Sequence, residues 1–166
     1  MEHFKYCPMC RRELVWSFVE GRNRLFCAGC GWINFKNPLP VVACLVSDHE
    51  KGLLLIKRGV EPAKGEWALP DGFIEIDENL QESGARELEE ETGLQGEAGD
   101  LIGIYQHESP MYGAILMVGF EYHRTGGELK CGDDADDAQY FPFDQVPEMP
   151  FLSHKKLIQE YLTKIQ

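Results

Sequence analysis

Apolar runs mark candidate strands in the larger, C-terminal part of the chain. Residues 41–46 (VVACLV) and 53–56 (LLLI) are continuous apolar runs, and a polar stretch that ends at Gly52 joins them. Short runs bounded by turn residues are typical of buried strands, so these two are expected to pair as a hairpin. Similar patterns predict strands at 102–105 and 114–122, and a last strand at 138–143.

Two segments have the spacing of helices. Beyond residue 150, apolar side chains recur at helical intervals and predict a helix that covers the sheet: Leu152, Leu157, Ile158, Leu162 and Ile165. The second helix follows Asp77, a candidate N-cap, and ends at Gly93. Acidic residues in its first turns suit the positive end of the helix dipole.

The N-terminal part has a different pattern. Residues 14–26 (LVWSFVEGRNRLF) alternate around a turn at residues 20–23, as a short β-hairpin does. Two prolines then stiffen residues 37–40 and indicate a hinge. We therefore expect a small lobe at residues 1–37 and a larger domain at 38–166.

Charge divides along the same boundary. The net charge of the chain is -12, and residues 1–37 contribute six Lys or Arg against three Glu, a net of +3. The remainder carries 10 basic against 25 acidic residues, or -15. Nucleic-acid-binding domains usually carry a basic surface, so nucleic acid is disfavoured as a partner of the larger domain. A body this acidic needs a cation to bind an anionic substrate.

Four cysteines in the small lobe form two C-x2-C motifs, Cys7 with Cys10 and Cys27 with Cys30. The 16 residues between the motifs match the spacing of zinc sites. Two disulfides or four reduced core cysteines are the alternatives. Without a secretory signal we expect a reducing cytoplasm, which favours one structural Zn²⁺ ion. Cys44, in an apolar run, is expected in the core.

Acidic residues gather on the helix that is predicted between Asp77 and Gly93. At about 100° per residue, Glu87, Glu90 and Glu91 share one face, with Gly84 and Leu88 on the neighbouring arc. Clustered carboxylates suit Mg²⁺ or Mn²⁺, whose remaining ligands are water and substrate phosphate oxygens. A solvated acidic helix face is the alternative, and most charge runs are of that kind.

The full spacing from residue 72 to residue 94 decides between these interpretations. The segment GFIEIDENLQESGARELEEETGL resembles the Nudix box, Gly-x5-Glu-x7-Arg-Glu-U-x-Glu-Glu-x-Gly-U, where U is a bulky aliphatic residue, at every fixed position. The resemblance implies an α/β fold, the Nudix α/β/α sandwich with a mixed sheet, preceded here by the small zinc-ribbon lobe. It also implies hydrolysis of nucleoside diphosphates that are linked to another group.

Site residues follow from the resemblance. The metal positions are Glu87, Glu90 and Glu91, and a carbonyl from Gly72 or its neighbour Asp71 adds a ligand. Arg86 is expected to orient Glu87, and Glu78 is a supporting acid. The general base is left open between Glu87 and an aspartate, Asp133 or Asp134, from the loop before the last strand. The alternative for that acidic loop is an exposed segment without a catalytic role.

Substrate preference rests on weaker signals. The chain lacks the Ser-Gln-Pro-Trp-Pro-Phe-Pro stretch of NADH pyrophosphatases, whereas Pro110 lies 16 residues after Leu94, as a proline often does in ADP-ribose pyrophosphatases. We expect hydrolysis of ADP-ribose to AMP and ribose 5-phosphate, or of FAD. NADH and NAD-capped RNA are the alternatives. Arg58 is a candidate for contact with a substrate phosphate. Trp67, Tyr105 or Tyr112 could stack on the adenine ring, and packing in the hydrophobic core is the alternative role for each.

A non-enzymatic role is also open. The small lobe carries basic and aromatic residues and could bind RNA or a protein, although zinc ribbons more often stabilise a fold or mediate dimerisation. No apolar run reaches the roughly 20 residues of a membrane span. We therefore expect a cytoplasmic protein. The resemblance implies a small nucleotide substrate, and it leaves a homodimer open as the assembly because dimers are frequent in the family. The choice between Mg²⁺ and Mn²⁺ is undecided.

Overall fold

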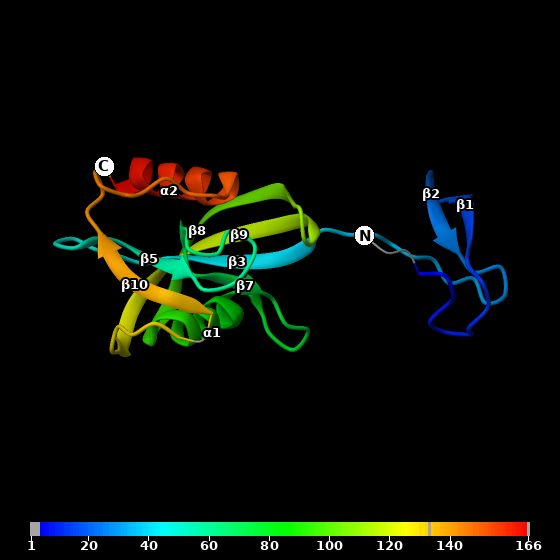
Figure 1. Cartoon of the computed structure of the whole chain (residues 1–166), viewed down its shortest axis with the longest axis horizontal. Coiled ribbons are helices and arrows are strands. Elements are labelled where there is room, and N and C mark those ends of the chain that lie inside the picture. Colours follow the sequence, from blue (N-terminus) through cyan, green and yellow to red (C-terminus); the bar gives the residue numbers. More distant parts are fainter. Residues whose placement is uncertain (1–3, 133, 166) are drawn as a thin grey trace. The chain divides into compact units, whose positions relative to one another are not determined.

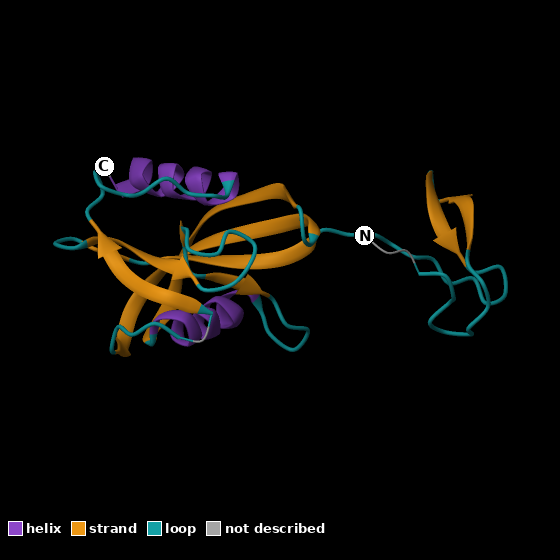
Figure 2. Ribbon diagram, viewed as in Figure 1, coloured by secondary structure: helices purple, strands orange, loops and turns teal. Residues whose placement is uncertain are grey.

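The computed structural model describes residues 4–132 and 134–165. The chain divides into two compact units, residues 1–37 and 38–166 (Figures 1 and 2). Within the described part, neither helix has the length and apolar character needed to span a membrane.

The N-terminal unit is built on one hairpin. Strand β1 (Val15–Val19) pairs antiparallel with β2 (Arg22–Phe26), with Val19 opposite Arg22. Gly21 adopts a positive φ of 75° in the turn, a conformation that glycine reaches without steric cost. Its small core consists of Cys7, Leu14, Leu25 and Cys27 with Trp32 packed against it. With so few buried residues, the unit needs a further source of stability.

The larger unit contains two sheets. One has the strand order β7-β3-β9-β8, and in it β3 runs parallel to β9 while the other pairs are antiparallel. Its strands are β3 (Leu39–Leu45), β7 (Asp71–Phe73), β8 (Leu94–Ser109) and β9 (Gly113–Gly127). The other has the order β10-β5-β4 with β6 also paired to β5. Its strands are β4 (Ser47–Asp48), β5 (Gly52–Arg58), β6 (Trp67–Ala68) and β10 (Ala135–Phe141).

Helices α1 (Leu80–Thr92) and α2 (Leu152–Ile165) cover opposite faces of these strands (Figure 2). Alternate side chains of the apolar run at 41–46 point to opposite faces, so the run feeds two cores. Val41, Ala43 and Leu45 lie in one core with Leu157 of α2. Val42, Cys44 and Val46 lie in the other with Leu88 of α1. The structure confirms the predicted α/β/α sandwich with a mixed sheet, and it confirms Cys44 as a core residue.

The predicted hairpin between residues 41–46 and 53–56 forms only close to its turn, and most of the first run pairs elsewhere. Strand β3 pairs with β7 and β9, whereas Ser47 and Asp48 pair with the start of β5 and the Val46 carbonyl oxygen accepts a hydrogen bond from the Leu54 N–H. The chain thus passes from one sheet to the other at Val46. A run that is apolar on both faces carries no alternation to show which strand is its partner.

Two element boundaries also differ from the prediction. The helix N-cap is Asn79, not Asp77: its side chain accepts hydrogen bonds from the backbone N–H groups of Gln81 and Glu82. The Glu82 carboxylate accepts a hydrogen bond from the Asn79 N–H, which completes a capping box. The last strand spans residues 135–141, not 138–143, because its bulged pairing with β5 begins in the acidic loop.

Candidate functional site

Two glycines allow helix α1 to approach the sheets closely. A Cβ on Gly72 of β7 would come within 2.0 Å of the Glu87 carboxyl carbon. A Cβ on Gly84 would come within 2.0 Å of the hydroxyl oxygen of Tyr122. Gly93 ends the helix in the left-handed conformation, with φ of 67°, as predicted. The glycine positions thus bring the Glu87 carboxylate directly onto strand β7.

Arg86 organises the acids on the exposed side of α1. Its Nε and Nη2 donate to the two carboxylate oxygens of Glu78 at 2.6 and 2.9 Å. Its Nη1 donates to Glu87 at 2.7 Å and to Glu90 at 3.0 Å. Its Nη2 also donates to the carbonyl oxygen of Phe73, the last residue of β7. The bidentate contact lowers the pKa of Glu78 from its ordinary value to about 2.

Glu91 lies on the inner side of the helix, against strand β7. The Asp71 N–H donates to Glu91 Oε2 at 3.0 Å. Burial raises the pKa of Glu91 well above its usual range, and the charge of Asp71 adds to this effect. Burial likewise raises the pKa of Asp71 to about 6, although Arg58, which contacts Asp71 Oδ1 at 3.3 Å, partly offsets it. Burial raises the pKa of Glu87 as well, against the hydrogen bond from Arg86.

These carboxyl groups line one pocket of about 300 Å³. Of the residues predicted for the site, the pocket wall includes Arg58, Gly72, Glu87, Glu91, Tyr112 and Asp134. Asp71, the predicted alternative to Gly72, is also on the wall, and so are Phe73, His107, Phe151 and His154. Hard carboxylate oxygens gathered in one pocket, with pKa values raised by burial and mutual repulsion, fit a divalent cation such as Mg²⁺ or Mn²⁺.

Other predicted residues lie outside the pocket wall. Glu90 turns toward Arg86 and its side chain is 59% exposed. Arg86 contacts both Glu78 and Glu87, and neither Arg86 nor Glu78 is on the wall. Pro110 follows Ser109 of the wall directly and precedes Tyr112 by two residues, without belonging to the wall itself. Asp133 lies outside the described residues.

The three candidate adenine-stacking residues have separate environments. Trp67 packs edge-on against Phe141, with ring centroids 4.8 Å apart, and so belongs to the core. The Tyr105 hydroxyl donates to Glu160 of α2 and is not on the pocket wall. Tyr112 meets Phe73 edge-on at 5.1 Å within the pocket. Tyr112 is therefore the member of this set that a substrate base can reach.

Helix α2 supplies a wall of the pocket that the sequence pattern did not reveal. Phe151 immediately precedes it, with the Arg58 guanidinium 5.4 Å from the ring centroid. His154 lies 5.0 Å from the same ring and is fully buried. Burial, with Arg58 nearby, lowers the pKa of His154 to about 3, so the imidazole is neutral. No local motif marks these residues, because only the packing of α2 brings them to the site.

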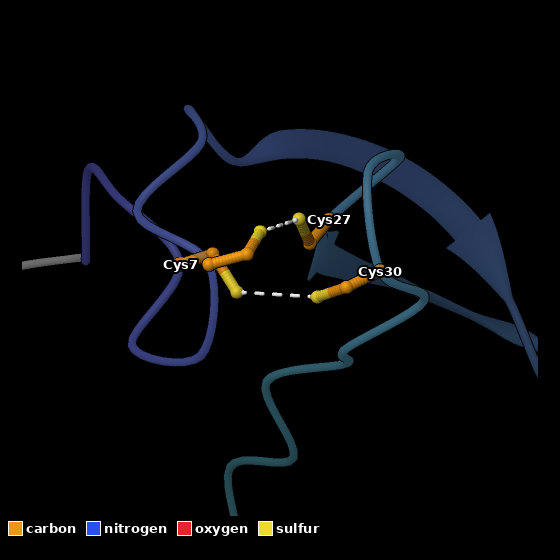
Figure 3. Close-up of side chains that lie close together, drawn as sticks. Cys7, Cys27 and Cys30 are labelled. Atoms are coloured by element: carbon orange, nitrogen blue, oxygen red, sulfur yellow. Dashed lines mark hydrogen bonds between the residues drawn. The ribbon is translucent and has the colours of Figure 1, made fainter.

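The four cysteines of the N-terminal unit converge (Figure 3). Their sulfur atoms all lie within 4.8 Å of one another. Cys7 Sγ is 3.6 Å from Cys30 Sγ, and Cys10 Sγ is 3.4 Å from Cys27 Sγ. A disulfide needs about 2.05 Å, whereas sulfurs around a tetrahedral Zn²⁺ lie about 3.8 Å apart, given Zn–S bonds of about 2.3 Å. The arrangement is that of a small zinc-ribbon lobe.

Comparison with known proteins identifies the family of the larger unit. The NUDIX domain family matches residues 37–161. An ADP-ribose pyrophosphatase of Methanocaldococcus jannaschii is 38% identical over 129 residues, which cover 77% of this chain and 75% of that protein. An NAD-capped RNA hydrolase, NudC, of Stutzerimonas stutzeri is 27% identical over 163 residues. This match covers 96% of the chain but 56% of the relative, so the chain spans little more than half of that protein.

Solved structures show the same fold. The crystal structure of a NUDIX hydrolase from Nitrosomonas europaea superposes with a TM-score of 0.83 and 27% identity, covering 97% of this chain and 92% of that one. The NUDIX domain of NrtR from Shewanella oneidensis, solved with ADP ribose, gives a TM-score of 0.68 at 24% identity, and at that identity it supports the fold alone. The chain therefore belongs to the Nudix hydrolase family.

Proposed function

We propose that this protein hydrolyses the pyrophosphate bond of a nucleoside diphosphate derivative, with ADP-ribose as the first candidate and FAD as the second. The observation that carries the proposal is the grouping of Glu87, Glu91 and Gly72 on the wall of one pocket. A carboxylate wall in an acidic protein binds a diphosphate only with the help of cations. The pocket therefore suits metal-dependent hydrolysis at phosphorus.

The oxygen atoms of the pocket indicate which residues would bind the catalytic divalent ion. Glu87, Glu90 and Glu91 would hold Mg²⁺ or Mn²⁺ together with a carbonyl from Gly72 or Asp71. When bound, such an ion neutralises phosphate oxygens and lowers the cost of deprotonating water. Glu90 now bonds to Arg86, so it would have to release that contact to join the set.

The chain's own groups supply positioning and proton transfer. Arg86 holds the Glu87 carboxylate through a charge-assisted hydrogen bond. Glu87 or Asp134, both on the pocket wall, accepts the proton of the attacking water. Arg58 brings a positive charge to the wall beside Asp71, where it can meet a phosphate oxygen.

Two features support ADP-ribose. The archaeal relative that matches three quarters of the chain is an ADP-ribose pyrophosphatase. The pocket also offers Tyr112 and Phe73 at one place and Phe151 at another as faces for an aromatic base. The expected products are AMP and ribose 5-phosphate.

A substrate panel tests the proposal. The protein is incubated with Mg²⁺ or Mn²⁺ and, separately, ADP-ribose, FAD, NADH, diadenosine polyphosphates, nucleotide sugars and nucleoside triphosphates. Products are then identified by chromatography and mass spectrometry. ADP-ribose is expected to give the highest kcat/KM. Dominant cleavage of triphosphates would reject the substrate assignment, and no cleavage of any compound would reject the function.

NAD-capped RNA is a second candidate, because the match to NudC extends over 163 residues and so includes the N-terminal unit. That unit exposes Trp16 and Phe18, which could stack on bases, beside several basic residues. RNA binding should weaken steeply as salt rises. Titration of labelled RNA at several salt concentrations tests this, and no binding at low salt would exclude it.

For the N-terminal unit we propose one structural Zn²⁺ held by Cys7, Cys10, Cys27 and Cys30. Four thiolates leave no open coordination position, so the ion would serve folding and not catalysis. A cytoplasmic location and a homodimer complete the proposal. Cell fractionation and light scattering, respectively, would test them.

A further inference from the structure

His154 is a fully buried histidine with one satisfied and one unsatisfied ring nitrogen. Its Nδ1 accepts a hydrogen bond from the Leu69 N–H at 3.2 Å. Nδ1 therefore carries no proton, and the neutral ring keeps its proton on Nε2. Among the described residues, nothing accepts a hydrogen bond from Nε2. An unpaired buried N–H costs free energy, so a partner is expected in another state of the site.

The nearest acid to this N–H is Asp71. His154 Nε2 lies 4.0 Å from Asp71 Oδ1, and Arg58 Nη1 lies 3.3 Å from the same oxygen. Both distances exceed the ordinary N–H···O length of about 2.9 Å. The carboxyl group thus sits loosely between two donors. A displacement of about 1 Å toward His154 would close the missing hydrogen bond.

Asp71 is connected in turn to the carboxylates of α1. Its N–H donates to Glu91 Oε2 at 3.0 Å, and the next residue, Gly72, packs against Glu87. Asp71 is therefore in direct contact with Glu91, one of the groups that are proposed to hold the ion. Groups that hydrogen-bond to metal ligands set ligand orientation, and their loss typically weakens metal binding.

We propose that His154 is a positioning residue of the metal site. When a divalent ion binds, the Nε2–H of His154 donates to Asp71 Oδ1. This bond fixes Asp71, and through it Glu91, in the geometry that the ion needs. This role rests on the proposed metal-dependent hydrolysis. Helix α2, which covers one face of the sheet, would then also help to position the metal ligands.

Mn²⁺ binding to three variants tests the proposal without substrate. His154→Phe keeps the size of the ring and removes both nitrogens, whereas His154→Gln keeps a donor near the position of Nε2. The concentration of free Mn²⁺ is followed by electron paramagnetic resonance. We expect about tenfold weaker binding in His154→Phe and affinity within about threefold of the wild type in His154→Gln. The control His123→Phe changes an exposed histidine of β9 and should bind Mn²⁺ normally.

The Mn²⁺ dependence of ADP-ribose hydrolysis distinguishes a positioning role of His154 from a purely structural one. If His154 acts through the ion, high Mn²⁺ concentrations should restore ADP-ribose turnover in His154→Phe. Because Mn²⁺ that binds the folded state also stabilises it, the variants must be shown to be folded before Mn²⁺ is added. Circular dichroism before each assay establishes that the variants are folded.

Nuclear magnetic resonance of the wild type keeps the proposal testable even if the variants do not fold. The Nε2–H proton of His154 should shift downfield and exchange more slowly with water when Mg²⁺ saturates the site. An unchanged signal, or wild-type Mn²⁺ affinity in folded His154→Phe, would overturn the positioning role. Normal Mn²⁺ binding with the expected His154 dependence, but without pyrophosphate hydrolysis, would reject the proposed function and leave this role intact.

Discussion

The α-carbon of Gly72 packs directly against the carboxylate of Glu87. A Cβ at residue 72 would lie 2.0 Å from two atoms of that carboxyl group, which is far inside van der Waals contact. The contact joins strand β7 to the middle of helix α1. It explains in physical terms why a glycine stands at the first position of the Nudix box.

Gly72→Ala should therefore displace Glu87 from the pocket wall. The added methyl group cannot be accommodated without moving the carboxylate, and a misplacement of about 1 Å can lower the rate about a hundredfold. We expect a fall of that order in kcat/KM for ADP-ribose, with the far-ultraviolet circular dichroism unchanged.

Gly126→Ala is the matched control. A Cβ at that position meets the flexible end of the Gln95 side chain at 3.0 Å, and its other neighbour, the Gln95 Cβ, lies at an ordinary contact distance of 3.9 Å. This variant should keep its activity. Wild-type kinetics in folded Gly72→Ala would show that Glu87 does not need its observed position.

Arg86→Lys should lower activity although the charge is retained. Arg86 makes a two-point contact with Glu78 while it also holds Glu87 and Glu90, and a lysine ammonium cannot reproduce this planar fork. A reduction of about tenfold to a hundredfold in kcat/KM is expected, as for other residues that orient ligands. Steady-state kinetics checks it, and an unchanged kcat/KM would contradict the orienting role.

The Glu78–Arg86 contact also predicts an acid-dependent part of the protein's stability. Arg86 lowers the pKa of Glu78 from 4.5 to about 2 in the folded protein. The stabilising contribution is therefore complete above about pH 4.5 and disappears as the pH falls through about 2. Urea unfolding of wild type and Glu78→Gln should differ at pH 7, and the difference should shrink between pH 4.5 and 2. A difference that is independent of pH would contradict the assignment.

Removal of zinc should unfold the N-terminal unit and leave the larger unit folded. The small core cannot stabilise residues 4–37 alone, and metal binding supplies folding free energy in such lobes. After chelation, amide signals of this unit should lose their dispersion while those of residues 38 onward persist. Cys131→Ser, which changes an exposed free cysteine, should retain one zinc ion per chain. Full signal dispersion in metal-free protein would contradict the prediction.

Features encoded over a short stretch of sequence could be predicted. The helix that carries Glu87 and Glu91, its stop at Gly93, the contact of Arg86 with Glu87 and the convergence of four cysteines all follow from fixed spacings within one segment or two motifs. The N-cap was misplaced by two residues. The capping-box pattern of Asn79 and Glu82 was a signal that could have corrected it.

Long-range packing could not be predicted in the same way. Strand β3 is apolar on both faces, so its parallel pairing with β9, far along the chain, had no local signature. Phe151 and His154 reach the pocket only because α2 folds back over it. Nothing in the spacing around these residues distinguishes them from ordinary core positions.

Turnover of ADP-ribose by wild type and Glu91→Gln, at saturating Mg²⁺ and Mn²⁺, tests the central claim most directly. If carboxylates of α1 assemble a metal site for pyrophosphate hydrolysis, the wild type should release AMP and ribose 5-phosphate. The amide variant, although folded, should be slower by about a hundredfold or more. Equal rates in the two folded proteins would contradict the account.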